Sequence, residues 1–281
     1  MLANKVDFIA TIEVKNANPN GDPLAGNMPR TDSNGFGLIS DVAIKRKIRN
    51  RMQDQGNEIF VKSRDHSDDG FNSLQKRFEN EFKKEPDEEV EKRSNEKWLD
   101  VRTFGQVITY QKRSIGIRGP LSISMAKSLD PIEITSMQIT RSTNGMEPTG
   151  SSGRSSDTMG TKHFVEYGVY VVYGSANVYF SEKTGFDEKD LSVVKESLLT
   201  LFANDASSAR PEGSMAIKEL FWFTHSNKLG NVSSAKIHDL FEYDKAPVEH
   251  TSYESYKIRL NEEKLNEYKE KGLTVEVLEG L

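Results

Sequence analysis

The longest apolar run in the chain constrains its fold most. Residues 164–180 read FVEYGVYVVYGSANVYF, and residues 6–14 read VDFIATIEV. Runs this rich in β-branched and aromatic residues are typical of buried strands. Helical patterns are predicted at 40–53, 188–204 and 261–271, and further strands at 114–126, 133–141 and 216–224, with a short strand after 271. This order predicts an α+β sandwich of the split βαβ type.

Three polar segments separate these elements. Residues 15–37 are predicted to form one long loop without regular structure, and such loops are usually functional. Residues 64–100 contain 12 acidic and 8 basic residues, and we interpret them as an inserted, solvated helical element. Residues 142–160, STNGMEPTGSSGRSSDTMG, are too polar to pack and predict a hairpin arm that projects from the body.

Charge is distributed unevenly along the chain. The net charge is −5, from 38 basic and 43 acidic residues. Much of the acidity lies in 64–100 and in the C-terminal section 239–281, where 11 acids face 6 bases. The remaining residues carry 24 bases and 20 acids. A mildly basic centre of this kind can bind a polyanion locally.

Several classes of protein are excluded. A chain of 281 residues can bury a core without staples, and the absence of cysteine excludes disulfide scaffolds, thiol catalysis and thiolate zinc sites. The N-terminus has no basic head before an apolar run, and no apolar stretch approaches 18 residues. We expect a cytoplasmic protein with no membrane partner.

The strongest local feature is the basic segment 45–51, KRKIRNR. On a helix, Ile44, Ile48 and Met52 share one face. The residues predicted to lie across the other side are Arg46, Lys47, Arg49 and Asn50. Two interpretations remain open, a solvated helix face or a helix that contacts phosphates after a Gly/Asn-rich loop.

Three more polar or basic patches follow. They are residues 112–120, KRSIGIRGP; the arm with Arg141, Arg154, Lys162 and His163; and residues 207–211, SSARP. A plain turn is the alternative interpretation of residues 112–120. Together with the basic helix, they favour one shared polyanion groove on an otherwise acidic chain.

Evidence for catalysis is poor. The five histidines are scattered, and no phosphate-loop, GxSxG or HExxH motif is present. Asp22, Asp32 and Asp41 could ligate Mg²⁺, but capping and turn roles explain them more simply. We therefore expect no enzymatic activity, no cofactor and no metal site.

Ordered motifs between residues 6 and 225 resemble one known family. They are NPNGDP at 18–23, GNMPRTD at 26–32, the stretch 35–41 with the helix that follows, DVRTFG at 100–105, SIGIRGP at 114–120, QITRS at 138–142, DTMGTKH at 157–163 and SSARPEGSM at 207–215. The chain resembles the seventh Cas protein family, and more narrowly the backbone subunit of the type I-C CRISPR Cascade complex.

The resemblance implies an architecture and a function. The fold would be an RRM-like (ferredoxin-like) palm with a helical fingers insertion at 64–100 and a β-hairpin thumb at 140–162, in one domain. Copies would stack head to tail along one CRISPR RNA, and each thumb would kink the guide. The guide would then pair with the target DNA strand, beside an RNA-processing cap subunit and a large subunit of the complex.

The same resemblance implies RNA contacts at thirteen positions. They are Asn18, Asn20, Arg30, Lys45, Arg46, Arg49, Arg118, Arg141, Lys162, His163, Ser207, Ser208 and Arg210. Sequence would be read by base pairing, so backbone contacts from modest basic loops suffice. The acidic insert and C-terminal section would face away from the RNA.

Two other functions remain as alternatives. One is a metal-dependent RNA endonuclease of the same superfamily, which would use acids between Asp22 and Asp41 or the histidine His163. The other is a generic single-strand-binding module, which would stack bases on exposed aromatic residues.

Overall fold

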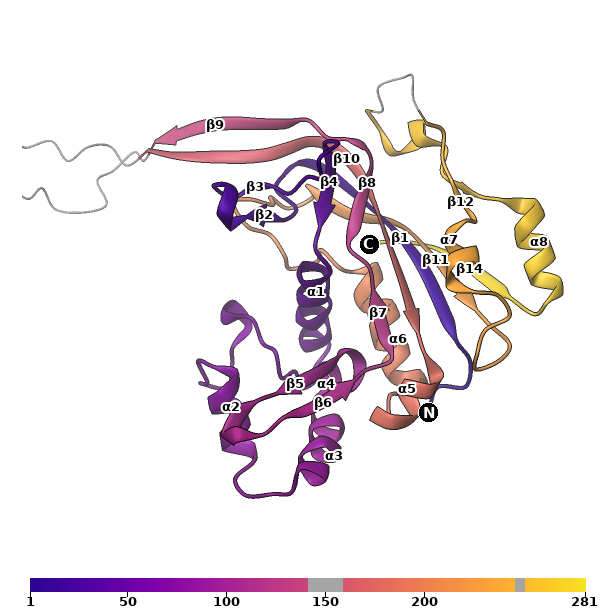
Figure 1. Ribbon diagram of the computed structural model, residues 1–281. Coiled ribbons are helices and arrows are strands. Elements are labelled where there is room, and N and C mark those ends of the chain that lie inside the picture. The colour runs from indigo at the N-terminus through magenta and orange to yellow at the C-terminus, as the bar shows by residue number, and fades with distance from the viewer. Residues whose placement is uncertain (141–158, 246–250) are drawn as a thin grey trace, which may run out of the picture.

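A computed structural model describes residues 1–140, 159–245 and 251–281. It shows a mixed α/β fold built on one antiparallel sheet of eight strands within these ranges (Figure 1). The strands are β1 (Val6–Ala17), β4 (Phe36–Ile39), β7 (Leu121–Ile123), β8 (Ala126–Pro131), β9 (Ile134–Thr140), β10 (Met159–Ala176), β11 (Met215–Thr224) and β14 (Thr274–Glu279). Their order is β14-β11-β1-β10-β8-β4, and β7 and β9 also pair with β10.

Smaller elements surround this sheet. The short ribbons are β2 (Gly21–Asp22) with β3 (Met28–Pro29), β5 (Gly105–Ile108) with β6 (Ile115–Arg118), and β12 (Phe241–Glu242) with β13 (Arg259–Leu260). The helices are α1 (Asp41–Asp54), α2 (Leu74–Glu81), α3 (Asp87–Lys97), α4 (Leu99–Phe104), α5 (Val178–Thr184), α6 (Glu188–Leu199), α7 (Ser234–His238) and α8 (Glu262–Glu270). The 3₁₀ turns are η1 (Pro23–Ala25), η2 (Arg64–His66), η3 (Tyr110–Lys112) and η4 (Tyr253–Tyr256). None of these helices has the length and apolar character that a membrane span requires, as far as the described ranges go.

Strand β1 is buried on both faces, which explains its nearly unbroken apolar sequence. Successive side chains of a strand point to opposite faces. Phe8 and Ile12 accordingly belong to a core cluster with residues of α1 and α6, whereas Ile9 belongs to a second cluster on the other face. The sheet is therefore the middle layer of the body.

The C-terminal section covers the second face of the sheet. Ile237 of α7, Tyr256 of η4 and Leu265 of α8 pack in one cluster with Ile9 and with Phe223 of β11. RRM domains stack bases on aromatic residues of an open sheet face. The centre of this sheet face is covered here, so it offers no open platform of that kind.

The helical insert has an apolar core of its own. Phe60, Phe78, Phe82 and Trp98 are buried together, with Ile115 from β6. This cluster draws α2, α3, α4 and the β5–β6 ribbon into one unit beside α1 (Figure 1). The insert thus has a packed core, while most of its residues stay exposed to solvent.

A two-stranded arm extends from the sheet (Figure 1). It consists of β9 and the first half of β10, whose register runs from Met159 opposite Thr140 to Val165 opposite Ile134. Residues 141–158 lie outside the described part, and so do Arg141, Arg154 and most of the predicted thumb at 140–162.

Comparison with the predicted elements gives one confirmation and two corrections. Helix α1 begins as predicted, because the Ser40 hydroxyl accepts a hydrogen bond from the Ala43 N–H. The prediction of an unstructured loop at 15–37 is wrong, since β2, η1, β3 and β4 occupy it. The strand predicted at 164–180 ends at Ala176, because the Asn177 side chain caps α5 through the Phe180 N–H.

Candidate nucleic-acid interface

Four segments meet at the end of β1 from which the arm departs. The Asn18 N–H donates to the carbonyl of Ala209 at 2.8 Å, and the Asn18 side chain donates to the carbonyl of Asn27 at 2.7 Å. The Asn20 side chain accepts from the N–H of Ser40, the N-cap of α1, at 2.9 Å. These bonds join β1, the β2–β3 ribbon, α1 and the loop before β11 into one surface, here named the palm edge.

Asn18 and Asn20 therefore hold the palm edge together. Asn18 is 3% exposed, and its Oδ1 has no hydrogen-bond partner in the described residues. The Arg30 backbone donates to the carbonyl of Asn20 at 3.2 Å, while the Arg30 guanidinium lies 3.6 Å from the Asp22 carboxylate. These contacts leave Arg30 partly exposed at the palm edge, with its contribution to RNA binding still a prediction.

A buried lysine lies beside this surface. Lys47 of α1 forms an ion pair with Asp205, and the Arg210 Nε donates to the same carboxylate at 3.0 Å. Burial is the largest cause that lowers the pKa of Lys47 to about 8; Asp205 opposes this shift and Arg210 adds to it. Two cations therefore share one anion, and their summed charge stays positive.

Lys47 corrects the helical projection made from sequence. It was predicted on the face opposite Ile44 and Ile48, but it is 6% exposed. Its position three residues after Ile44 puts it at the edge of the buried face. The ring of Phe202 lies 5.4 Å from its ammonium.

The other basic residues of α1 have different surroundings. Lys45 pairs with Asp41 at 2.9 Å and lowers the pKa of that carboxyl, and Arg46 pairs with Asp65 at 3.2 Å on the exposed side. Arg49 donates to the fully buried Asp100 at 2.9 Å. The geometry of Arg49 favours a structural ion pair, whereas phosphate contacts by Lys45 and Arg46 remain predictions.

The loop before β11 presents hydroxyl groups. Ser207 and Arg210 exchange backbone hydrogen bonds at 2.8 and 3.1 Å, which leaves Ser208 at the tip of a tight turn. Both serines are exposed. Exposed hydroxyl groups next to a guanidinium can receive a phosphate.

The remaining predicted contacts lie at two other places. Lys162 and His163 stand on β10 in the arm, where the Ser136 hydroxyl lies 2.7 Å from the His163 ring. Because Ala17 pairs with Val165, this part of the arm begins beside Asn18. Arg118 ends β6, and its guanidinium lies 4.1 Å above the Phe180 ring, on the insert side of the molecule.

Asp22 and Asp32, two acids considered for a metal-dependent nuclease, each bond to a different partner. Asp22 caps η1 through the Leu24 N–H, and Asp32 pairs with Lys127 at 2.7 Å, which lowers the pKa of Asp32. Within the described ranges, no group of three or more His, Asp or Glu side chains is placed to hold a metal ion.

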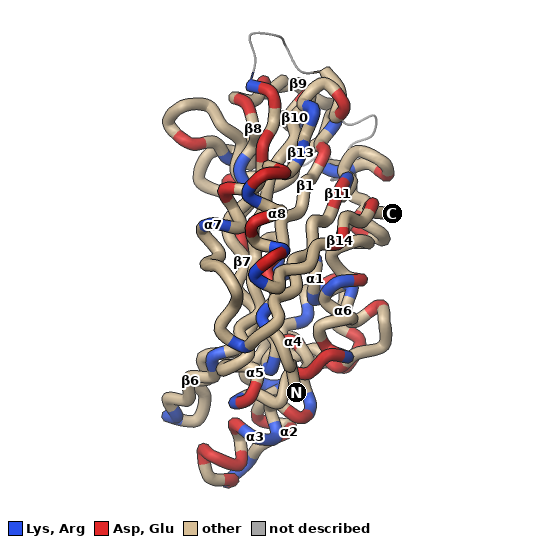
Figure 2. Tube along the Cα trace, turned by 90° about the vertical axis from the view of Figure 1, so that its right-hand side faces the viewer, with Lys and Arg blue, Asp and Glu red and all other residues tan. Residues whose placement is uncertain are grey.

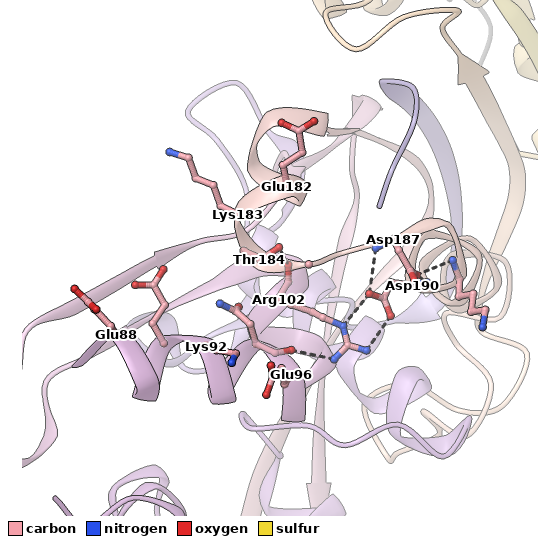
Figure 3. A pocket seen from close by; sticks show the side chains of 13 residues that line it. Glu88, Lys92, Glu96, Arg102, Glu182, Lys183, Thr184, Asp187 and Asp190 are labelled. Carbon is pink, nitrogen blue, oxygen red and sulfur yellow. Dashed lines mark hydrogen bonds and ion pairs between the residues drawn. The ribbon is translucent and has the colours of Figure 1, made fainter. Parts of the chain in front are cut away.

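A cleft on the insert side of the molecule differs from the palm edge in charge. Its volume is about 710 Å³, and it lies between α3 and the α5–α6 segment. Figure 3 shows Glu88 of α3 and Glu182 of α5 at its walls, and the Arg102–Asp190 ion pair between α4 and α6. Its lining holds six carboxylates and four cations, and this net negative charge is unfavourable for a phosphate backbone. Acidic residues also recur around α3 and along α8 (Figure 2).

Sequence reasoning missed Asp205 and left Lys47 out of the candidate contacts. The signal for Lys47 was its i+3 spacing from Ile44. Asp205 carried no local signal, because its partner lies 158 residues earlier in the chain.

Most of the chain is similar to known proteins. The family model described as CRISPR-associated protein Cas7 matches residues 4–261. A CRISPR-associated protein Cas7 from Haloferax volcanii is 40% identical over 60 residues, which cover 21% of this chain and 18% of that protein. Two solved chains are titled as parts of a CRISPR RNA-guided surveillance complex, one of them pre-nicking. The pre-nicking chain has a TM-score of 0.48 at 16% identity, and the match covers 78% of this chain and 75% of that one. The other has a TM-score of 0.45 at 15% identity, and the match covers 95% of this chain and 83% of that one.

Proposed function

The chain belongs to the CRISPR-associated Cas7 family, and we propose that it is a non-catalytic backbone subunit that binds CRISPR RNA. We assign it to a type I-C Cascade complex that acts in antiviral defence in the cytoplasm. Copies would assemble head to tail along the guide, which presents its bases to the target DNA strand. The cap subunit that processes the RNA and the large subunit would complete the complex.

One observation carries this proposal: the palm edge gathers cationic and hydroxyl groups that sequence separates widely. Lys47 and Arg210 share Asp205, and Ser207 and Ser208 lie beside them in the same loop. Two cations that share one carboxylate keep a net positive charge, and this charge can bind a phosphate. Such contacts follow the RNA backbone and not its sequence.

The sheet supports the same assignment. Its second face is covered by the C-terminal section, so base stacking over the sheet centre is blocked. This disfavours a generic single-strand-binding module that relies on an open aromatic platform. Head-to-tail contacts are heterologous and generate an open filament whose length the guide would limit.

Binding and cleavage assays test the proposal against the endonuclease alternative. Fluorescence anisotropy with a labelled CRISPR RNA and with a shuffled sequence of equal length should give affinities within about twofold of each other. No cleavage should occur with or without Mg²⁺. Absence of RNA binding contradicts the proposal. Cleavage that is lost in Asp41→Asn or His163→Ala would establish the nuclease instead.

A further inference from the structure

A second hollow, of about 670 Å³, lies in the insert between the segment that follows α1 and the start of α2. Its volume falls within the roughly 300–1,000 Å³ of small-molecule pockets. Lys62, Arg64 and Arg77 line it, together with Phe71, and none of the described lining residues is acidic. This contrasts with the acidic cleft between α3 and α5.

Two of the three cations are fixed by acids that lie outside the lining. Lys62 donates to Asp68 at 2.5 Å. Arg77 donates to both oxygens of Asp69 at 2.6 and 3.0 Å, and this pairing holds the pKa of Asp69 well below its usual range. The two ion pairs make the walls rigid and nearly neutralise them.

Arg64 is the cation that remains for a ligand. It is exposed at the start of η2 and has no ion pair or hydrogen bond with any described residue. The first turn of α2, capped by Ser73, opens at the same hollow, since Ser73 and Leu74 line it. Arg64 and the N–H groups of this turn can bind one phosphate together.

Phe71 and Asn72 supply recognition of a base. The Phe71 N–H donates to Asp69 at 3.1 Å, and its carbonyl accepts from the Ser67 hydroxyl at 3.0 Å, so its backbone is fixed. Its partly exposed ring offers a stacking surface. The Asn72 amide, which also lines the hollow, can donate to and accept from a base edge.

The loop that forms the hollow is fastened to the exposed side of α1. Arg46 pairs with Asp65 at 3.2 Å, the Gln53 side chain donates to the carbonyl of His66 at 2.8 Å, and the Ser63 hydroxyl donates to Asn50 at 3.2 Å. These three contacts place the loop that carries Arg64 beside the exposed side of α1, where Arg46 lies.

We propose that this hollow binds one nucleotide of a single-stranded nucleic acid, with the phosphate on Arg64 and α2 and the base on Phe71. The inference rests on the proposed RNA-binding function and adds to it a discrete nucleotide site in the insert, apart from the palm edge. It replaces, for this part of the insert, the expectation that residues 64–100 face away from the RNA.

Anisotropy titrations of the full chain with a fluorescein-labelled uridine 12-mer test this site. Arg64→Ala should weaken binding several-fold and reduce the salt slope by about 0.7. Phe71→Leu should weaken binding about tenfold with the slope unchanged, and Phe71→Tyr should restore it. Lys76→Ala is the matched control, because Lys76 is exposed on α2 outside the lining; its affinity should stay within about twofold.

A mononucleotide separates failure of this site from failure of the proposed function. Uridine 5′-monophosphate, titrated into the isotope-labelled full chain, should shift the Phe71 and Asn72 amide signals in the wild type but not in Arg64→Ala. If the 12-mer binds but both Arg64→Ala and Phe71→Leu behave as wild type, the site is refuted and the RNA-binding function stands. If the 12-mer does not bind, the RNA-binding function fails, and unshifted amide signals then refute the hollow as well.

Discussion

Lys47 of α1 forms an ion pair with Asp205, a residue 158 positions later in the chain, beside the palm edge. Arg210 approaches the same carboxylate, so this anion joins the basic helix to the hydroxyl-bearing loop before β11. The shared carboxylate therefore fixes Arg210 beside α1, although the two segments are far apart in sequence.

Removing Arg210 should weaken RNA binding without changing sequence preference. Arg210→Ala leaves Lys47 neutralised by Asp205, so the palm edge loses its excess positive charge. We expect affinities for unrelated guides to fall by the same factor, and the dependence of log affinity on log salt to decrease by about 0.7. Anisotropy at 50 to 300 mM salt measures both quantities.

Lys257→Ala is the control for that experiment. Lys257 is an exposed cation of the C-terminal section and is paired with Asp244. Its substitution should leave RNA affinity and the salt dependence unchanged. A loss confined to some guide sequences would indicate base readout by Arg210 and would refute the backbone-contact account.

Arg49 should matter for stability more than for RNA affinity. Asp100 is fully buried and accepts from Arg49 at 2.9 Å and from the N–H groups of Phe60 and Val61 at 2.7 and 3.0 Å. Breaking such a buried pair costs about 3–5 kcal/mol. Arg49→Ala should lower the free energy of unfolding by that order in urea titrations.

The exposed Arg46 provides the comparison. Its pair with Asp65 lies at the surface, so Arg46→Ala should cost less than about 1 kcal/mol while weakening RNA binding. The account of Arg49 is wrong if both variants are equally stable.

The lowered pKa of Lys47 predicts that the protein becomes more stable at alkaline pH, relative to a variant that lacks this lysine. Its pKa of about 8 in the folded protein lies below the roughly 10.4 of an unfolded lysine. Between these values the unfolded chain binds more protons, so deprotonation favours the folded state. The free energy of unfolding of the wild type, minus that of Lys47→Met, should increase from pH 8 to pH 10. Urea titrations at each pH measure it, and a flat or decreasing difference would exclude the buried lysine.

The tip of the β5–β6 ribbon should be stabilised by glycine. Gln111 and Lys112 have φ angles of 56° and 59°, a left-handed conformation that costs a residue with a Cβ about 1 kcal/mol. Lys112→Gly should gain about 0.5–1 kcal/mol after its backbone entropy is counted. Thermal unfolding should show this gain for glycine and none for Lys112→Ala, which keeps the Cβ; equal melting temperatures for the two variants would argue against strain.

Local patterns predicted the elements that carry their own signal. The apolar run of β1 and the Ser40 cap of α1 are examples, because strand burial and capping depend on neighbours in sequence. The two-residue strands β2 and β3 carried no such signal. Gly21 pairs with Pro29 in this ribbon, and the Asn18 side chain bonds to the Asn27 carbonyl just before β3, a tertiary contact that no local pattern announces.

The candidate site divides in the same way. Lys45, Arg46 and the serine loop could be identified from composition and family resemblance. The pairing of Lys47 with Asp205, and the enclosure of Arg49 by Asp100, depend on which segments tertiary folding brings together. The sequence alone therefore does not reveal whether a basic residue is free to bind a ligand or is neutralised by an ion pair within the fold.

Size-exclusion chromatography with light scattering, with absorbance at 260 and 280 nm, tests the central claim most directly. The protein would be purified after expression with no CRISPR array, and with arrays that encode a short and a long guide. The account predicts a nucleic-acid-rich assembly whose mass increases with guide length. Identical, RNA-free particles from all three expressions would contradict a backbone subunit that polymerises along its guide.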